Sequence, residues 1–193
     1  MLKEDLDNFY PTSQQDWRQW LEENHRLKQS VWLIYYKKKS SMPTISWSEA
    51  VDQALCFGWI DSTAKPIDEE KYKQFFTRRK PKSVWSKVNK QKVQRLIDHG
   101  LMMQAGSESI EIAKQNGSWT ILDDVEELTI PEDLEKEFIT KPGSKDFFLS
   151  LSKSVKKAIL QWLVLAKLPE TRQKRMSEIA ELASQKLKPK QFR

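Results

Sequence analysis

Apolar residues recur along the first forty positions of the chain with two different periods. Over residues 12–25, Trp17, Trp20 and Leu21 follow a spacing of three to four residues, which predicts a helix with one apolar face. Over residues 31–39 the chain reads VWLIYYKKK, a β-branched and aromatic run that predicts a buried strand ending in solvated lysines. The pattern therefore changes from helix to strand within a short stretch of chain.

The central part of the chain predicts a helix followed by two paired strands. The helix follows Ser46, which has the spacing of a capping box with Glu49, and Gly58 stands where a helix commonly ends in a left-handed conformation. Residues 59–65 and 71–79 predict two strands joined by a polar turn.

Helical periodicity continues to the end of the chain. Further helices are predicted over residues 86–100, 105–117, 130–138, 144–167 and 169–188. The stretch KPGSK is the best candidate for a linker. We therefore predict an α+β fold, in which a small antiparallel sheet is flanked by helices and the C-terminal part is all helical. The expected division is an α+β domain over residues 1–140 and a helical region over residues 141–193.

The composition excludes several kinds of site. Five glycines among 193 residues nearly exclude an ordinary glycine-rich phosphate loop. Cys56 is the single cysteine, so no intrachain disulfide and no thiolate metal site is predicted, and we expect neither a metal nor a cofactor. The first residues lack the apolar core of a signal peptide, and no apolar run approaches the roughly 18 residues of a membrane span. We therefore predict a cytoplasmic protein without a transmembrane segment.

Charge is distributed in blocks along the chain. Residues 71–97 contain many Lys and Arg residues and no acidic one, whereas residues 108–140 are mainly acidic. Aromatic rings interleave with the cations of the basic segment, which fits a nucleic-acid surface that contacts phosphates and stacks bases. In the alternative and favoured interpretation, the rings point into the core and the cations form a solvated rim. The net charge of +6 identifies no partner, because blocks of opposite sign can pair within the fold.

The most specific local feature is a pair of arginines at the end of a predicted strand. Arg78 and Arg79 come shortly before a helix that Ser83 or Ser86 opens. Guanidinium groups beside free helix amides form an anion pocket in principle. Asp61, at the end of GWID, could instead pair with one of the arginines across adjacent strands. We favour this structural ion pair, because buried charges are usually paired.

Residues suited to catalysis are sparse. His25 and His99 are the only histidines, and each falls near a predicted helix C-terminus. Cys56 falls in an apolar stripe and is expected to be a small buried residue. The motifs H-E-x-x-H, C-x-x-C and G-x-S-x-G are absent from the sequence. A non-enzymatic protein is therefore favoured, and no catalytic residue is predicted.

Four longer stretches have a more specific pattern: EAVDQALCFGWIDS, YKQFFTRRKPKSVWSKVNKQKVQRLIDHGLM, AGSESIEIAKQNGSW and AKLPETRQKRMSEIAELA. They resemble the YdeI/OmpD-associated family, also described as bacteriocin-protection proteins, and together they cover most of residues 17–184. The resemblance implies association with an outer-membrane porin, protection against bacteriocins or antimicrobial peptides, and a small α+β domain. It implies no catalytic residues. The positions that match the family pattern are Trp59, Asp61, Arg78, Arg79, Trp85, Ser86 and Asn89.

These observations predict a cytoplasmic, non-enzymatic binding protein linked to peptide resistance or envelope stress, with a small anionic ligand or a protein as its partner. The binding site is expected between the sheet edge and the helix that begins near Ser86. Its cations are Arg78, Arg79 and Lys82, its apolar walls Trp59 and Trp85, and its orienting polar groups Asp61 and Asn89. If a cationic peptide is bound directly, the acidic block over residues 108–140 is the better surface.

Two alternatives belong to other functional classes. The first is a nucleic-acid-binding protein that uses residues 71–97, and steep salt dependence would identify it. The second is an enzyme that acts on a small anionic substrate at the arginine pocket. Asp61 is the only nearby candidate for its general base.

Overall fold

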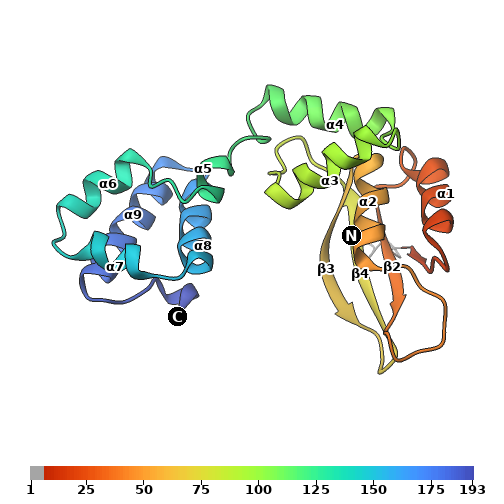
Figure 1. Ribbon diagram of the computed structural model, residues 1–193, viewed down its shortest axis with the longest axis horizontal. Helices are drawn as coiled ribbons and strands as arrows, with labels where there is room; N and C mark the ends of the chain where they lie inside the picture. Colours follow the sequence, from red (N-terminus) through yellow and green to blue (C-terminus); the bar gives the residue numbers. More distant parts are fainter. Residues whose placement is uncertain (1–6) are drawn as a thin grey trace, which may run out of the picture. The chain divides into compact units, whose positions relative to one another are not determined.

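The computed structural model describes residues 7–193, which form two compact units, one ending at Trp119 and the other spanning Thr120–Arg193 (Figure 1). This division precedes the one expected after residue 140. The physical reason is helix α6 (Glu132–Ile139), which packs against α9 (Pro169–Ser184) and so belongs to the second unit.

A four-stranded sheet organises the first unit, in the order β1-β2-β4-β3. Its strands are β1 (Asn8–Phe9), β2 (Ser30–Tyr36), β3 (Trp59–Pro66) and β4 (Lys71–Arg78). The pair β3–β4 is antiparallel, as predicted for two strands joined by a turn. The pair β2–β4, which was not predicted individually, is also antiparallel, whereas β1 runs parallel to β2 and makes the sheet mixed. Strand β1 was not predicted, because two residues are too few for a periodic signal.

Strand β4 alternates its side chains between the core and the opposite face of the sheet. Gln74 and Phe76 are buried, and Phe76 belongs to the hydrophobic core. Lys73 and Phe75 occupy the alternate positions of the strand, so their side chains point to the other face. The basic segment therefore sends one set of rings inward and keeps its strand lysines on the outer face.

The described part of the first unit has four helices: α1 (Gln14–Asn24), α2 (Trp47–Cys56), α3 (Lys87–Asp98) and α4 (Gln104–Gln115). Helix α2 packs against β3, and α1, α3 and α4 each pack against α2. The capping box at the start of α2 is confirmed, since Ser46 accepts from the amide of Glu49 while the Glu49 carboxylate accepts from the amide of Ser46. Ser13 caps α1 and Ser86 caps α3, each by accepting a hydrogen bond with its side chain from the backbone N–H three residues later.

An aromatic core holds α1 and α2 on the sheet. Trp17 is fully buried, donates its indole N–H to the carbonyl of Ala50 at 3.0 Å, and contacts Phe76 edge to face. Trp59 is also fully buried, at the start of β3. Helix α4 approaches the end of α2 closely at Gly106. The first unit is therefore an α+β fold, as predicted.

The second unit contains only helices among its regular elements, as expected for the C-terminal part. They are α5 (Asp123–Glu126), α6, α7 (Ser144–Ser150), α8 (Lys153–Val164), α9 and a short 3-10 helix, Lys190–Phe192. Buried apolar side chains from several of these helices form its core, among them Phe138 of α6 and Phe148 of α7, whose ring centroids lie 5.4 Å apart. Over residues 7–193, no helix has the length and apolar character needed to cross a bilayer.

The acidic block pairs largely within the fold. Asp133 accepts two hydrogen bonds from Arg172, at 2.6 and 3.0 Å, and Glu126 pairs with Lys157 at 2.7 Å. The guanidinium of Arg172 lowers the pKa of Asp133 below its ordinary value. These contacts tie α5 and α6 to α8 and α9.

We expect Asp133→Asn to lower the free energy of unfolding of the second unit by at most about 1 kcal/mol at neutral pH, since the pair is partly exposed. The folded pKa of Asp133 lies below the unfolded one, so the pair stabilises the fold at neutral pH and loses this effect as the pH falls through the folded pKa. Urea unfolding at pH 7 and at strongly acidic pH measures the difference. Glu111→Gln, in a more exposed pair with Lys114, is the control and should change little. A difference for Asp133→Asn that persists in acid would contradict the assignment.

Candidate functional site

Asp61 lies on the core-facing side of β3, opposite Phe76, and its carboxylate is held by two neutral donors. The indole N–H of Trp47 donates to Oδ2 at 2.8 Å, and the side-chain amide of Gln74 donates to the same oxygen at 3.1 Å. Among the ion pairs of the described residues, none joins Asp61 to an arginine. The expected cross-strand ion pair is therefore replaced by hydrogen bonds to uncharged groups.

Arg78 points toward the loop that connects α1 to β2. Its Nε donates to the carbonyl of Lys28 at 2.8 Å. Its cross-strand neighbour Trp59 donates its indole N–H to the nearby carbonyl of His25 at 3.3 Å. Both side chains thus fasten the end of the sheet to one loop, and Trp59 is a core residue rather than the wall of a pocket.

Arg79 turns away from Arg78, toward the loop that precedes α3. Its guanidinium carbon lies 3.6 Å from the ring centroid of Trp85, and Nη1 donates to the carbonyl of Val84 at 3.0 Å. Burial lowers the pKa of Arg79 to about 10, and the charge of Asp61 opposes this shift. Asp61 is therefore close enough to act on Arg79 through its field, without a direct contact. The guanidinium groups of Arg78 and Arg79 therefore do not converge on one anion-binding pocket.

Two donors in this stacked pair are buried and have no hydrogen-bond acceptor. They are Nε of Arg79 and the indole N–H of Trp85, whose side chain is only 1% exposed. Buried N–H groups are almost always paired in folded proteins, so an unpaired one requires an explanation. We call Arg79, Trp85 and the adjoining Val84 the arginine–tryptophan corner.

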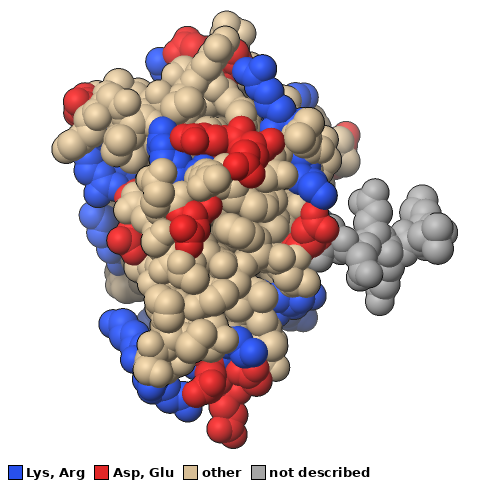
Figure 2. Space-filling model, turned by 90° about the vertical axis from the view of Figure 1, so that its right-hand side faces the viewer, with Lys and Arg blue, Asp and Glu red and all other residues tan. Residues whose placement is uncertain are grey.

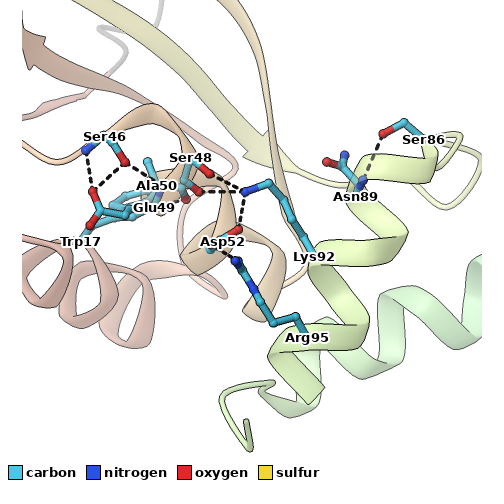
Figure 3. A network of polar contacts seen from close by, with 10 residues as sticks. All are labelled: Trp17, Ser46, Ser48, Glu49, Ala50, Asp52, Ser86, Asn89, Lys92 and Arg95. Carbon is cyan, nitrogen blue, oxygen red and sulfur yellow. Dashed lines mark hydrogen bonds and ion pairs between the residues drawn. The ribbon is translucent and has the colours of Figure 1, made fainter. Parts of the chain in front are cut away.

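The remaining predicted site residues lie at the start of α3. Ser86 is its N-cap and accepts from the backbone N–H of Asn89 at 3.2 Å (Figure 3). Lys82 is exposed in the turn before it. The structure thus brings Arg79, Trp85 and Ser86 together along one short segment, while Trp59 and Arg78 contact a different loop.

A second polar cluster, which the sequence analysis missed, joins α2 to α3. Lys92 donates to Asp52 at 2.6 Å and to the hydroxyl of Ser48 at 2.7 Å, and Arg95 pairs with the other oxygen of Asp52 (Figure 3). A cavity of about 280 Å³ borders this cluster and is lined in part by Asp52, Arg95 and His99. The i, i+3 spacing of the two cations on one helix face was its only sequence signal.

The basic segment does not form one continuous surface. Arg78 and Arg79 are engaged with backbone carbonyls, and Lys92 and Arg95 pair with Asp52. Figure 2 likewise shows basic and acidic side chains lying close together on the side in view. A nucleic-acid surface that uses the whole of residues 71–97 is therefore not supported by the geometry.

The residues considered for catalysis take part in local structure. Nδ1 of His25 and Nδ1 of His99 each contact the carbonyl four residues earlier, at 2.8 and 2.7 Å. Cys56 is fully buried, and burial raises the pKa of its thiol despite the opposing effect of Arg18. Among the residues that the structure describes, no group of three or more His, Cys, Asp or Glu side chains could hold a metal ion.

Comparison with known families assigns a different domain to each unit. Residues 9–109 match the family described as a domain of unknown function, DUF8412. Residues 127–186 match the family described as bacteriocin-protection, YdeI or OmpD-associated. Neither the curated proteins nor the solved structures contain a match.

The two matches divide the motifs quoted above. AKLPETRQKRMSEIAELA falls within the bacteriocin-protection match, whereas CFGWIDS and FTRRKPKSVWSKVN fall within the other. The predicted site residues therefore lie in the domain of unknown function. Residues 127–186 of the second unit are similar to the YdeI/OmpD-associated bacteriocin-protection family, and the chain belongs to the DUF8412 family.

Proposed function

We propose that the protein is a cytoplasmic, non-enzymatic binding protein that contributes to resistance against bacteriocins, other antimicrobial peptides or envelope stress. The match of the second unit to the bacteriocin-protection family supports the biological role. The first unit supplies the binding site, whose partner is a small anion or an anionic group of a protein.

The observation that carries the binding site is the pair of buried, unpaired donors in the arginine–tryptophan corner. Both are N–H groups, so they require an acceptor, and the adjacent guanidinium favours an anionic one. The N-terminus of α3, capped by Ser86, adds a favourable dipole beside them. In this proposal, Lys82 attracts the ligand and Asn89 orients it, both from the segment over residues 82–89.

An enzyme at this site is less well supported, because Asp61, the carboxylate whose charge acts on Arg79, already has hydrogen-bond donors. Asp61 Oδ2 accepts from Trp47 and Gln74, so these two donors fix the carboxylate in place and occupy the oxygen that a general base would use. Direct capture of a cationic peptide by the acidic block is also less well supported. Asp133 and Glu126 already have basic partners within the second unit.

We expect sulfate, used as a probe anion, to shift the NMR signals of the Arg79 Nε–H and the Trp85 indole N–H in a saturable manner. The substitution Arg79→Lys keeps the charge but removes Nε and the planar stack on Trp85, so the shift of the Trp85 signal should be lost. A ¹⁵N–¹H titration of the full chain measures both effects. In a bacteriocin-sensitive strain that expresses the chain, the same substitution should reduce survival.

The indole N–H of Trp17 is an internal control, because it is buried and already bonded to Ala50. Arg26→Lys, at an exposed arginine of the first unit, is the matched control for the change of arginine to lysine. If sulfate moves none of the corner signals, or moves that of Trp17 equally, the binding site is refuted. If sulfate binds but Arg79→Lys leaves survival unchanged, the link between this site and resistance is refuted.

A further inference from the structure

The outer face of the sheet carries a cluster of rings and lysines that is separate from the arginine–tryptophan corner. Trp32 of β2 and Phe75 of β4 are cross-strand partners, and Lys73 of β4 and Lys65 of β3 are partners on the next pair of strands. Alternation places all four side chains on the face opposite the core residues Leu33 and Phe76. We call Trp32, Lys65, Lys73 and Phe75 the outer-face cluster.

Trp32 is the centre of this cluster. It is only 8% exposed, yet it is not part of the hydrophobic core that the helices cover. Its ring is covered instead by side chains of the same face: the ring of Phe75 at 4.9 Å and the ammonium groups of Lys73 and Lys65 at 4.8 and 5.3 Å. Lysine side chains are flexible, so this cover can move aside without unfolding the sheet.

The charge of the face is of one sign. The outward positions that the strand register gives hold no acidic residue: Ser30, Trp32, Ile34 and Tyr36 on β2, Lys71, Lys73, Phe75 and Thr77 on β4, and Ile60 and Lys65 on β3. Lys65 and Lys73 form no ion pair with a carboxylate of the described residues. Lys71, by contrast, pairs with Asp68 at 3.3 Å and lies 5.8 Å from the ring of Tyr36. The ammonium groups of Lys65 and Lys73 are thus available to bind anionic groups of a partner.

We propose that the outer-face cluster binds single-stranded nucleic acid. A base stacks on Trp32 or Phe75 after the lysines leave the ring, and the released ammonium groups of Lys65 and Lys73 bind the flanking phosphates. One displacement therefore frees both the stacking surface and the phosphate contacts. A single strand fits this chemistry because its bases are accessible, whereas a duplex keeps them stacked inside. The inference does not depend on the proposed function, which uses other residues.

Fluorescence anisotropy of the full chain with a labelled oligothymidine of about ten nucleotides tests the proposal. We expect binding at about 50 mM salt that weakens steeply toward 200 mM. The double substitution Lys65→Gln/Lys73→Gln should weaken binding and flatten the plot of log K against log salt by roughly 1.4, about 0.7 for each lost phosphate contact. Phe75→Leu keeps an apolar side chain but removes a stacking ring, and should weaken binding about tenfold.

Lys167→Gln/Lys174→Gln is the matched control, since it removes two exposed lysines of the second unit and changes the net charge equally. Circular dichroism and the thermal midpoint verify that each variant is folded. Binding that is lost with the outer-face pair and kept with the control pair supports the proposal. Four results would overturn it: no binding at about 50 mM salt, equal loss with both pairs, equal affinity for a duplex of the same length, or complete displacement of the oligonucleotide by polyglutamate.

Discussion

Trp59→Ala is expected to lower the free energy of unfolding of the first unit by about 3–5 kcal/mol. Trp59 is fully buried at the start of β3, and its indole contacts Trp20 edge to face. Truncation removes the whole ring from the core and leaves the carbonyl of His25 without the indole donor. Since a domain of this size is stable by about 5–15 kcal/mol, the loss is a large fraction of the total.

Urea unfolding followed by far-UV circular dichroism measures the effect, and Trp47→Ala is the matched control. Trp47 is 48% exposed, so its removal should cost only about 1–2 kcal/mol, mainly from the hydrogen bond to Asp61. Equal losses for the two tryptophans would show that Trp59 is not the core residue described above. A folded Trp59→Ala protein with unchanged stability but impaired sulfate binding would instead return Trp59 to the site.

Gly106→Ala is expected to destabilise the first unit by about 1–3 kcal/mol, although helix propensity alone predicts a gain of about 0.5–1 kcal/mol. Gly106 lies in α4, and an added Cβ would overlap the carbonyl oxygen of Cys56 and approach the sulfur of Met102 to 2.5 Å. The Cys56 oxygen is backbone and already accepts from the amide of Met103, so it cannot move aside cheaply. Steric overlap and helix propensity thus predict changes of opposite sign in the free energy of unfolding.

Ser107→Ala is the control for Gly106→Ala, because it changes the next residue of the same helix at an exposed position. It should be neutral or slightly stabilising. The thermal midpoint and the urea unfolding of both variants show whether steric overlap or helix propensity has the larger effect. If Gly106→Ala were as stable as Ser107→Ala, the close approach of α4 to α2 would be refuted.

Local patterns were sufficient for most of the secondary structure. Ser46 and Glu49 form the predicted capping box, and the alternation of β4 places Phe76 inside and Lys73 outside. Such features depend on neighbours within four residues, which are visible in the sequence. The two-residue β1 and its parallel pairing were missed, because they depend on a partner more than twenty residues away.

The predicted site was only partly assembled by the fold. Arg79, Trp85 and Ser86 are close in sequence, and they remain close in the structure. Arg78 and Arg79 are adjacent in sequence but contact different loops, because β4 ends at Arg78 and Arg79 begins the loop that leads to α3. Asp61 was expected to need a charged partner, yet the indole of Trp47 and the amide of Gln74 hold it. Neither donor could be predicted from a local pattern, because Trp47 and Gln74 are distant from Asp61 in the sequence.

The sequence by itself determined the α+β class and the helical C-terminal part, since these follow from the periodicity of apolar residues. Only the tertiary structure decided which cations are free. It pairs Lys92 and Arg95 with Asp52, places Arg79 on Trp85, and leaves Lys65 and Lys73 over Trp32. The interaction energy of two charges depends on the distance between them in space. That distance is set only when strands and helices that are far apart in the sequence pack together.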